Sequence, residues 1–147
     1  MPRTLGLAHV NLNVSDIDRS VRFYREVFGL ELLSDETETI QKDGQPVELR
    51  QALLSTPGRQ DLLALSHAAS FPIGRGGLNH IGFNFESDED VRTAIQAVPH
   101  HGEKVVKEGE REEGGVREVF AYVQDPDGYY VEMATQAIVL SASRAPQ

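Results

Sequence analysis

A short phrase near the N-terminus returns near the middle of the chain, and this repeat constrains the fold more than any other feature. Residues 8–13 read AHVNLN and residues 79–84 read NHIGFN, so His9 and His80 occupy the same position of each phrase. The two histidines lie 71 positions apart in a chain of 147 residues, close to half its length. A repeat of this period predicts two similar modules, each a copy of one supersecondary unit.

The first half combines one helix with several strands. An apolar, alternating stretch over residues 5–14 predicts a strand, and Asp16 then predicts the start of a helix. Apolar side chains recur at helical spacing over residues 16–28, and a glycine follows as a stop signal. Further strands are expected at residues 30–34, 37–41, 47–55 and 61–66, separated by turn residues. The first half therefore predicts a βαβββ module over residues 5–67.

The second half repeats this order after a connecting segment. Residues 68–77 hold one proline and three glycines, which is typical of a linker between modules. A strand, a helix with an acidic first turn and three more strands are then expected at residues 78–85, 87–98, 104–108, 116–123 and 129–135. Residues 78–135 thus form a second βαβββ module of a single α+β domain, and residues 136–147 are expected to be a flexible tail.

Composition narrows the classes of partner. The formal net charge of −9 disfavours a nucleic-acid partner, because such a partner requires a clustered basic surface. The chain has no cysteine, which excludes disulfides, thiolate metal sites and cysteine nucleophiles. No run is apolar and long enough for a signal peptide or a membrane span. We therefore expect a cytoplasmic protein that acts on a small molecule, without a membrane or nucleic-acid partner.

The repeat also points to a metal site. Aligning the first and last strands of both modules gives four equivalent positions, which hold His9, Ala64, His80 and Glu132. A lone histidine in a strand is more often structural, but two at equivalent positions with one carboxylate favour a metal. Strand alternation places His80 and Glu132 on one face, and a cation compensates a carboxylate buried there. The predicted ligands are His9, His80 and Glu132, and the predicted cofactor is Fe²⁺, with Mn²⁺, Ni²⁺, Zn²⁺ or Co²⁺ as alternatives.

Three phrases of the chain resemble the vicinal oxygen chelate superfamily, whose members include glyoxalase I, type I extradiol dioxygenases, fosfomycin-inactivating transferases and bleomycin-sequestering proteins. The phrases are residues 8–30, 78–83 and 125–132, and the resemblance covers residues 5–135. It implies paired βαβββ modules whose mixed sheets curve into a cup around one divalent metal, with helices on the outer face. It also implies a homodimer, in which the cup is often built from the first module of one chain and the second module of its partner.

The resemblance implies roles for individual residues. His9, His80 and Glu132 match the ligand positions of the superfamily, whereas Ala64 stands where glyoxalase I has a carboxylate. Three ligands are what extradiol dioxygenases and the fosfomycin enzymes share. The resemblance therefore favours these two groups over glyoxalase I.

Two further residues are candidate catalytic groups. Tyr122 matches a tyrosine whose phenol hydrogen-bonds a metal-bound substrate oxygen, and the alternative is an aromatic that packs within its strand. His67 lies near the position of the acid–base histidine of extradiol dioxygenases, and the alternative is an exposed loop histidine.

Three functional hypotheses follow. The first is a dioxygenase-type reaction on a substrate that chelates the metal through two adjacent oxygens. The second is a glyoxalase-like isomerase or a thiol transferase, in which the metal stabilises an oxyanion. The third is a metal-free protein that sequesters a ligand, as bleomycin-resistance proteins do. A complete set of three ligands favours an enzyme over this last hypothesis.

Overall fold

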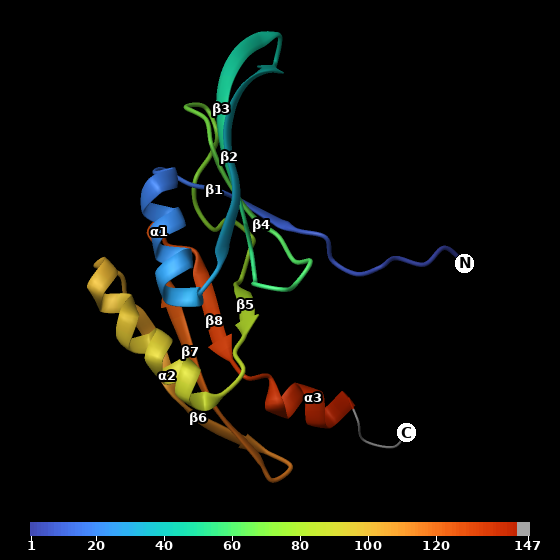
Figure 1. Cartoon of the computed structure of the whole chain (residues 1–147), viewed down its shortest axis with the longest axis vertical. Helices are drawn as coiled ribbons and strands as arrows, with labels where there is room; N and C mark the ends of the chain where they lie inside the picture. The colour runs from blue at the N-terminus through green and yellow to red at the C-terminus, as the bar shows by residue number, and fades with distance from the viewer. Residues whose placement is uncertain (144–147) are drawn as a thin grey trace. The chain divides into compact units, whose positions relative to one another are not determined.

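The structure is a computed structural model, and it describes residues 1–143. The chain divides into two compact units, one of residues 1–74 and one that begins at Arg75. Each unit contains one four-stranded mixed sheet with a helix packed against it (Figure 1). The α+β class and the two βαβββ modules predicted from the sequence are therefore confirmed.

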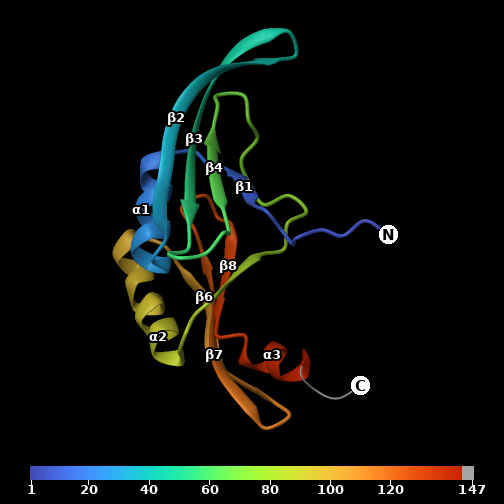
Figure 2. The same cartoon turned by 45° about the vertical axis from the view of Figure 1, so that its right-hand side comes forward.

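Unit 1 contains one strand, one helix and three further strands. They are β1 (Val10–Asn13), α1 (Ile17–Phe28), β2 (Glu31–Lys42), β3 (Gln45–Ser55) and β4 (Leu63–His67). The order in the sheet is β1-β4-β3-β2; β1 and β4 run parallel, and the other neighbours run antiparallel. Figure 2 shows α1 beside this sheet and the hairpin of β2 and β3 extending well past the end of β4.

Helix α1 begins and ends where its local sequence favours it. The Asp16 carboxylate accepts a hydrogen bond from the backbone N–H of Arg19 at 3.1 Å, which caps the helix. Gly29 closes it with a φ of 68°, a left-handed conformation that glycine adopts without strain. Phe23 and Tyr24 are at most 1% exposed. Burying each such side chain stabilises the unit by about 1.5–3 kcal/mol, so the apolar face of α1 fixes the helix on the sheet.

Unit 2 has the same succession of elements and two short additions. They are β5 (Ile81–Asn84), α2 (Asp88–Ala97), the 3₁₀ helix η1 (Val98–His101), β6 (Val105–Glu113), β7 (Val116–Gln124), β8 (Tyr130–Ala134) and α3 (Ala137–Ser143). The sheet order is β5-β8-β7-β6, with β5 and β8 parallel and the other neighbours antiparallel. Unit 2 therefore repeats the topology of unit 1 strand for strand.

The strand registers confirm that Ala64 and Glu132 are equivalent. In unit 1, Ala64 pairs with Asn11 on one side and with Leu53 on the other. In unit 2, Glu132 pairs with Gly82 and Tyr122 in the corresponding places. The alignment of the two modules made from the sequence is therefore correct at this position, where unit 1 has Ala64 and unit 2 has Glu132.

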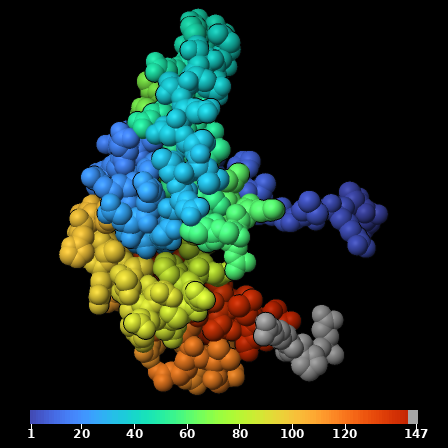
Figure 3. Space-filling model, viewed as in Figure 1, coloured from blue at the N-terminus to red at the C-terminus, as the bar shows by residue number. Residues whose placement is uncertain are grey.

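Several strands differ in length from the prediction, and β1 and β2 show the reasons. Strand β1 begins at Val10 and not at residue 5, because its pairing with β4 begins there. Leu5 and Leu7, ahead of it, are 108% and 84% exposed, and Figure 3 shows the N-terminal segment as a thin projection. Strand β2 is continuous over the two predicted segments 30–34 and 37–41, because β3 pairs with it along its length, with one irregularity between Leu32 and Ser34.

Helix α3 was not predicted, since the sequence led us to expect a flexible tail over residues 136–147. Its first backbone N–H, that of Ala137, donates to the carboxylate of Glu118 at 2.9 Å. Glu118, on β7, therefore satisfies one of the free N–H groups at the start of the helix. Residues 144–147 lie outside the described part of the chain, and flexibility of the tail stays a prediction. Within residues 1–143, no helix is long and apolar enough to cross a membrane.

Candidate metal centre

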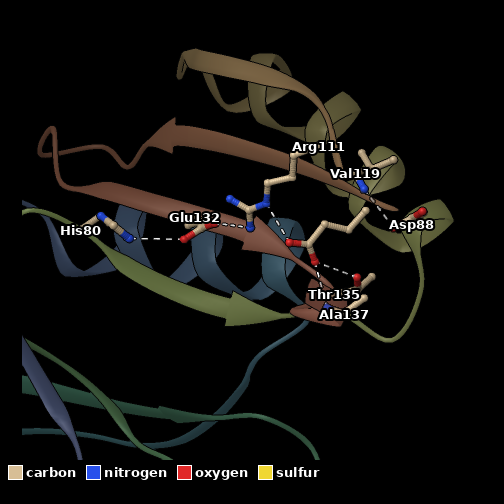
Figure 4. Close-up of polar contacts among 8 residues, drawn as sticks. His80, Asp88, Arg111, Val119, Glu132, Thr135 and Ala137 are labelled. Carbon is tan, nitrogen blue, oxygen red and sulfur yellow. Dashed lines mark hydrogen bonds and ion pairs between the residues drawn. The ribbon is translucent and has the colours of Figure 1, made fainter. Parts of the chain in front are cut away.

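Two of the three predicted metal ligands meet on the sheet of unit 2. His80 lies next to the start of β5 and Glu132 lies on the neighbouring strand β8. His80 Nε2 is 3.3 Å from Glu132 Oε2, and Figure 4 shows the two side chains pointing toward each other. The side chain of Glu132 is 10% exposed and that of His80 is 31% exposed. The pair therefore combines a nearly buried carboxylate with an imidazole that solvent or a ligand can reach.

The hydrogen bonding of His80 favours a cation between the pair. His80 Nδ1 is 2.7 Å from Asn79 Oδ1, an acceptor, so Nδ1 carries the ring hydrogen in the neutral imidazole. The lone pair of Nε2 then faces the carboxylate oxygen of Glu132, and this arrangement is repulsive without a proton or a metal ion between them. Metal-binding histidines are commonly oriented by such a hydrogen bond at the other ring nitrogen. His80 and Glu132 therefore fit a divalent metal in both donor type and orientation.

Arg111 binds the other oxygen of the candidate ligand. Arg111 Nη2 donates to Glu132 Oε1 at 2.8 Å, and its Nε donates to Glu118 Oε1 at 2.7 Å. Glu118 is 1% exposed, and its second oxygen accepts hydrogen bonds from Thr135 Oγ1 at 3.1 Å and from the backbone N–H of Ala137. A buried carboxylate, an arginine and the candidate ligand thus form one chain of contacts (Figure 4).

The charge of Arg111 is secured by its surroundings. Partial burial lowers the pKa of the guanidinium, but hydrogen bonds and attraction to Glu118 and Glu132 outweigh this effect and raise the pKa above its ordinary value. The guanidinium also lies 4.8 Å from the ring centroid of Phe120, a favourable cation–π contact. Arg111 is therefore a fixed positive charge between two carboxylates.

The sequence analysis missed Arg111 and Glu118, although one signal was present. Counting outward from the Gly114-Gly115 turn pairs Arg111 with Glu118 across the hairpin of β6 and β7, and the structure shows this register. Opposite charges directly across an antiparallel pair attract each other. The repeat search did not reveal this pair, because it compared only the first and last strands of the modules.

The structure places Tyr122 beside the candidate ligands. Tyr122 pairs with Glu132 in register on β7 and β8, and its ring centroid is 5.1 Å from that of His80 in an edge-to-face arrangement. Phe120 lies two residues earlier on the same face, and its ring centroid is 6.2 Å from that of Tyr122. The structure records no hydrogen bond for the phenol of Tyr122 among residues 1–143, so this hydroxyl is available to a substrate.

The other two predicted site residues belong to unit 1. His9 is exposed just before β1. His67 extends β4 by one residue, and Nδ1 of its ring is 2.8 Å from the carbonyl oxygen of Val14. Alternation along β4 places His67 on the opposite face of the sheet from Ala64. The acid–base role of His67 stays a prediction, and this placement does not support it.

No three His, Asp or Glu side chains form a ready metal-binding group within residues 1–143. The structure brings together His80 and Glu132, and His9 belongs to the other compact unit. The complete ligand set of His9, His80 and Glu132 therefore stays a prediction.

Around Ala64, the corresponding face of unit 1 carries amide and hydroxyl side chains. Gln51 Nε2 donates to Ser66 Oγ at 3.0 Å, and Ser66 Oγ donates to Asn11 Oδ1 at 2.8 Å. Ala64 lies on β4 opposite Asn11 and is 3% exposed. This face offers amide and hydroxyl groups and lacks a carboxylate at the position equivalent to Glu132.

Comparison with known proteins shows which family the chain is similar to. A profile of the Glyoxalase/Bleomycin resistance protein/Dioxygenase superfamily matches residues 6–133. A probable lactoylglutathione lyase of Synechocystis is 29% identical over 132 residues, which are 86% of this chain and 92% of the relative. A lactoylglutathione lyase of Arabidopsis thaliana is 32% identical over 130 residues, which are 85% of this chain.

The match to the plant proteins covers only part of their length. This chain spans 42% of that Arabidopsis lyase and 35% of a probable chloroplastic one. Among solved structures, a glyoxalase family protein of Bacillus cereus superposes with a TM-score of 0.73 at 18% identity, over 90% of this chain and 95% of that one. This likeness supports the fold.

Proposed function

Because the chain belongs to the Glyoxalase/Bleomycin resistance protein/Dioxygenase superfamily, we propose that it is a divalent-metal-dependent lyase of the lactoylglutathione lyase type. The observation that carries the proposal is the contact of His80 and Glu132 in a chain whose relatives bear that name. The substrate class is the hemithioacetal of a thiol and a 2-oxoaldehyde, which presents two oxygens on adjacent carbons. The sequence alone favoured a dioxygenase, and the relatives favour a lyase instead.

We assign the metal to His9, His80 and Glu132. A bound divalent metal supplies Lewis-acid polarisation of a substrate oxygen. The ordered imidazole of His80 and the Oε2 of Glu132 that faces it support this assignment, since both atoms have the donor chemistry that Fe²⁺, Ni²⁺, Zn²⁺ or Co²⁺ accepts.

The reaction also needs groups that move a proton between two adjacent carbons. We assign this role to no single residue, because Arg111 engages Oε1 of Glu132 and the proposed metal engages Oε2. Tyr122, which faces the same side of the sheet, donates a hydrogen bond from its phenol to a substrate oxygen. His67 has no assigned step.

Ala64 favours a second candidate function. The position equivalent to Glu132 lacks a carboxylate in unit 1, and the sequence resemblance associates a three-ligand set with extradiol dioxygenases. The second candidate is therefore an Fe²⁺-dependent dioxygenase that acts on a catechol or a related vicinal diol.

One assay pair separates the two candidates. Tag-free protein is loaded with Ni²⁺, Co²⁺, Zn²⁺ or Fe²⁺ and tested with the hemithioacetal of methylglyoxal and glutathione, and in parallel with catechols in an oxygen electrode. The lyase proposal expects thioester formation and no oxygen uptake, with activity lost in Glu132→Gln. Oxygen uptake with catechols and no thioester would reject the lyase in favour of the dioxygenase.

We also propose a homodimer, which the superfamily resemblance supports. The chain has a mass of 16.2 kDa, so light scattering coupled to size exclusion should give about twice this value. A monomeric mass at micromolar concentration would contradict the proposal.

A further inference from the structure

The proposed lyase function does not account for Arg111, which donates a hydrogen bond to the candidate ligand Glu132. Its guanidinium bridges two carboxylates, with Nη2 at 2.8 Å from Glu132 Oε1 and Nε at 2.7 Å from Glu118 Oε1. A guanidinium has a rigid fork of donors, so both contacts fix its orientation together. Arg111 therefore holds one oxygen of Glu132 in a defined place.

Glu118 anchors the other end of this bridge. Its side chain is completely buried, and its Oε2 accepts hydrogen bonds from Thr135 Oγ1 and from the backbone N–H of Ala137. Backbone and hydroxyl donors on the segment after β8 thus fix the carboxylate from one side while Arg111 pairs with it from the other. A fully satisfied polar network of this kind rigidifies the groups it contains.

We propose that Arg111 is a positioning residue that restricts Glu132 to metal binding through Oε2 alone, with Glu118 holding Arg111 in place. The inference rests on the proposed metal-dependent function. A carboxylate that binds a metal through both oxygens takes two coordination positions, whereas one oxygen takes one. Engaging Oε1 with Arg111 therefore leaves a position for the second of two adjacent substrate oxygens.

The test measures Co²⁺ binding, which does not depend on turnover. The variants are Arg111→Met and the double variant Arg111→Met with Glu118→Gln. The double variant avoids an unpaired buried charge, and its glutamine still accepts a hydrogen bond from Ala137. Calorimetry gives the stoichiometry and the Kd, the visible absorption of bound Co²⁺ reports its coordination, and circular dichroism verifies folding.

The expected result is that both variants bind Co²⁺ about 10-fold to 100-fold more weakly than the parent, the range typical of lost partners of metal ligands. The visible spectrum of bound Co²⁺ should also change, because Glu132 then binds through both oxygens. Arg111→Lys should be intermediate, since a lysine keeps the charge without the two-pronged geometry.

Arg117→Met is the matched control. Arg117 lies on the same hairpin and pairs with Glu110 and Glu112, but its side chain is 65% exposed, and alternation places it on the other face from Glu118. This variant should keep the parent Kd and spectrum.

A double variant with the parent Kd and spectrum would overturn the positioning role. Another outcome is that the parent binds Co²⁺ and the Arg111 variants show the expected Kd and spectrum, while the enzyme turns over no hemithioacetal. This result would reject the lyase proposal and support the positioning role. A parent chain that binds no Co²⁺ would overturn both.

Discussion

The two units have one topology and different chemistry. Their sheets have equivalent strand orders, β1-β4-β3-β2 and β5-β8-β7-β6, and equivalent registers at the central strand. On the face opposite α1 in unit 1 and opposite α2 in unit 2, unit 1 has Ala64 and Leu53 where unit 2 has Glu132 and Tyr122. The helix-facing positions Leu65 and Met133 are thus apolar and buried in both units, while the opposite face of unit 2 carries most of the candidate reactive groups.

The arginine clusters of the two units show the same contrast. In unit 1, Arg50 joins Asp18 of α1 to Asp35 of β2, each at 2.7 Å, on the helix side of the sheet. In unit 2, Arg111 joins Glu118 to Glu132 on the side of the sheet opposite α2. The first cluster fastens a helix to its sheet near solvent, and the second orders a candidate metal ligand.

The largest effect should come from the carboxylate that unit 1 lacks. Glu132→Gln removes the charge and basicity of the candidate ligand and should lower hemithioacetal turnover by about 100-fold or more. Leu53→Met, at the unit 1 position equivalent to Tyr122, is a similar-sized apolar change and should leave turnover within about threefold of the parent. Initial rates at matched metal loading measure both; an active Glu132→Gln enzyme would contradict the assignment of chemistry to unit 2.

The helix-facing positions should respond alike in both units. Leu65 and Met133 occupy equivalent registers, and each is 0% exposed. Leu65→Ala and Met133→Ala should each cost about 2–5 kcal/mol of unfolding free energy, because each leaves a cavity between sheet and helix. Urea unfolding followed by circular dichroism measures this cost. A change below about 1 kcal/mol in only one of the two variants would show that the two cores are not equivalent.

The smallest effect should come from the exposed cluster of unit 1. Hydrogen bonds from Arg50 lower the pKa of both Asp18 and Asp35. Carboxylates with a lowered folded-state pKa add stability above their ordinary value of about 4, and they lose it as pH falls through the lowered pKa. The parent should therefore lose stability below about pH 4 more steeply than Arg50→Ala. Unfolding midpoints measured from pH 6 to pH 2 check this, and parallel curves would refute the contribution.

The sequence predicted most of the fold because the strand and helix periods are local patterns and the repeat shows that both halves share them. His80 and Glu132 could be paired from the sequence, since alternation and equivalent strand ends specify the face and the neighbour. His67 was harder to place, because alternation specifies its face only if β4 continues through residue 67, and the sequence predicted an end at residue 66. Arg111 and Glu118 were missed because their partners come from pairing across strands and not from the repeat.

A Co²⁺ titration of tag-free protein tests the central claim, that the pair of His80 and Glu132 in unit 2 is the core of a metal site. The account predicts one Co²⁺ per chain for the parent and for His67→Ala, and loss of tight binding in His80→Ala. Binding by His80→Ala with the parent stoichiometry and Kd, or no binding by the parent, would contradict it.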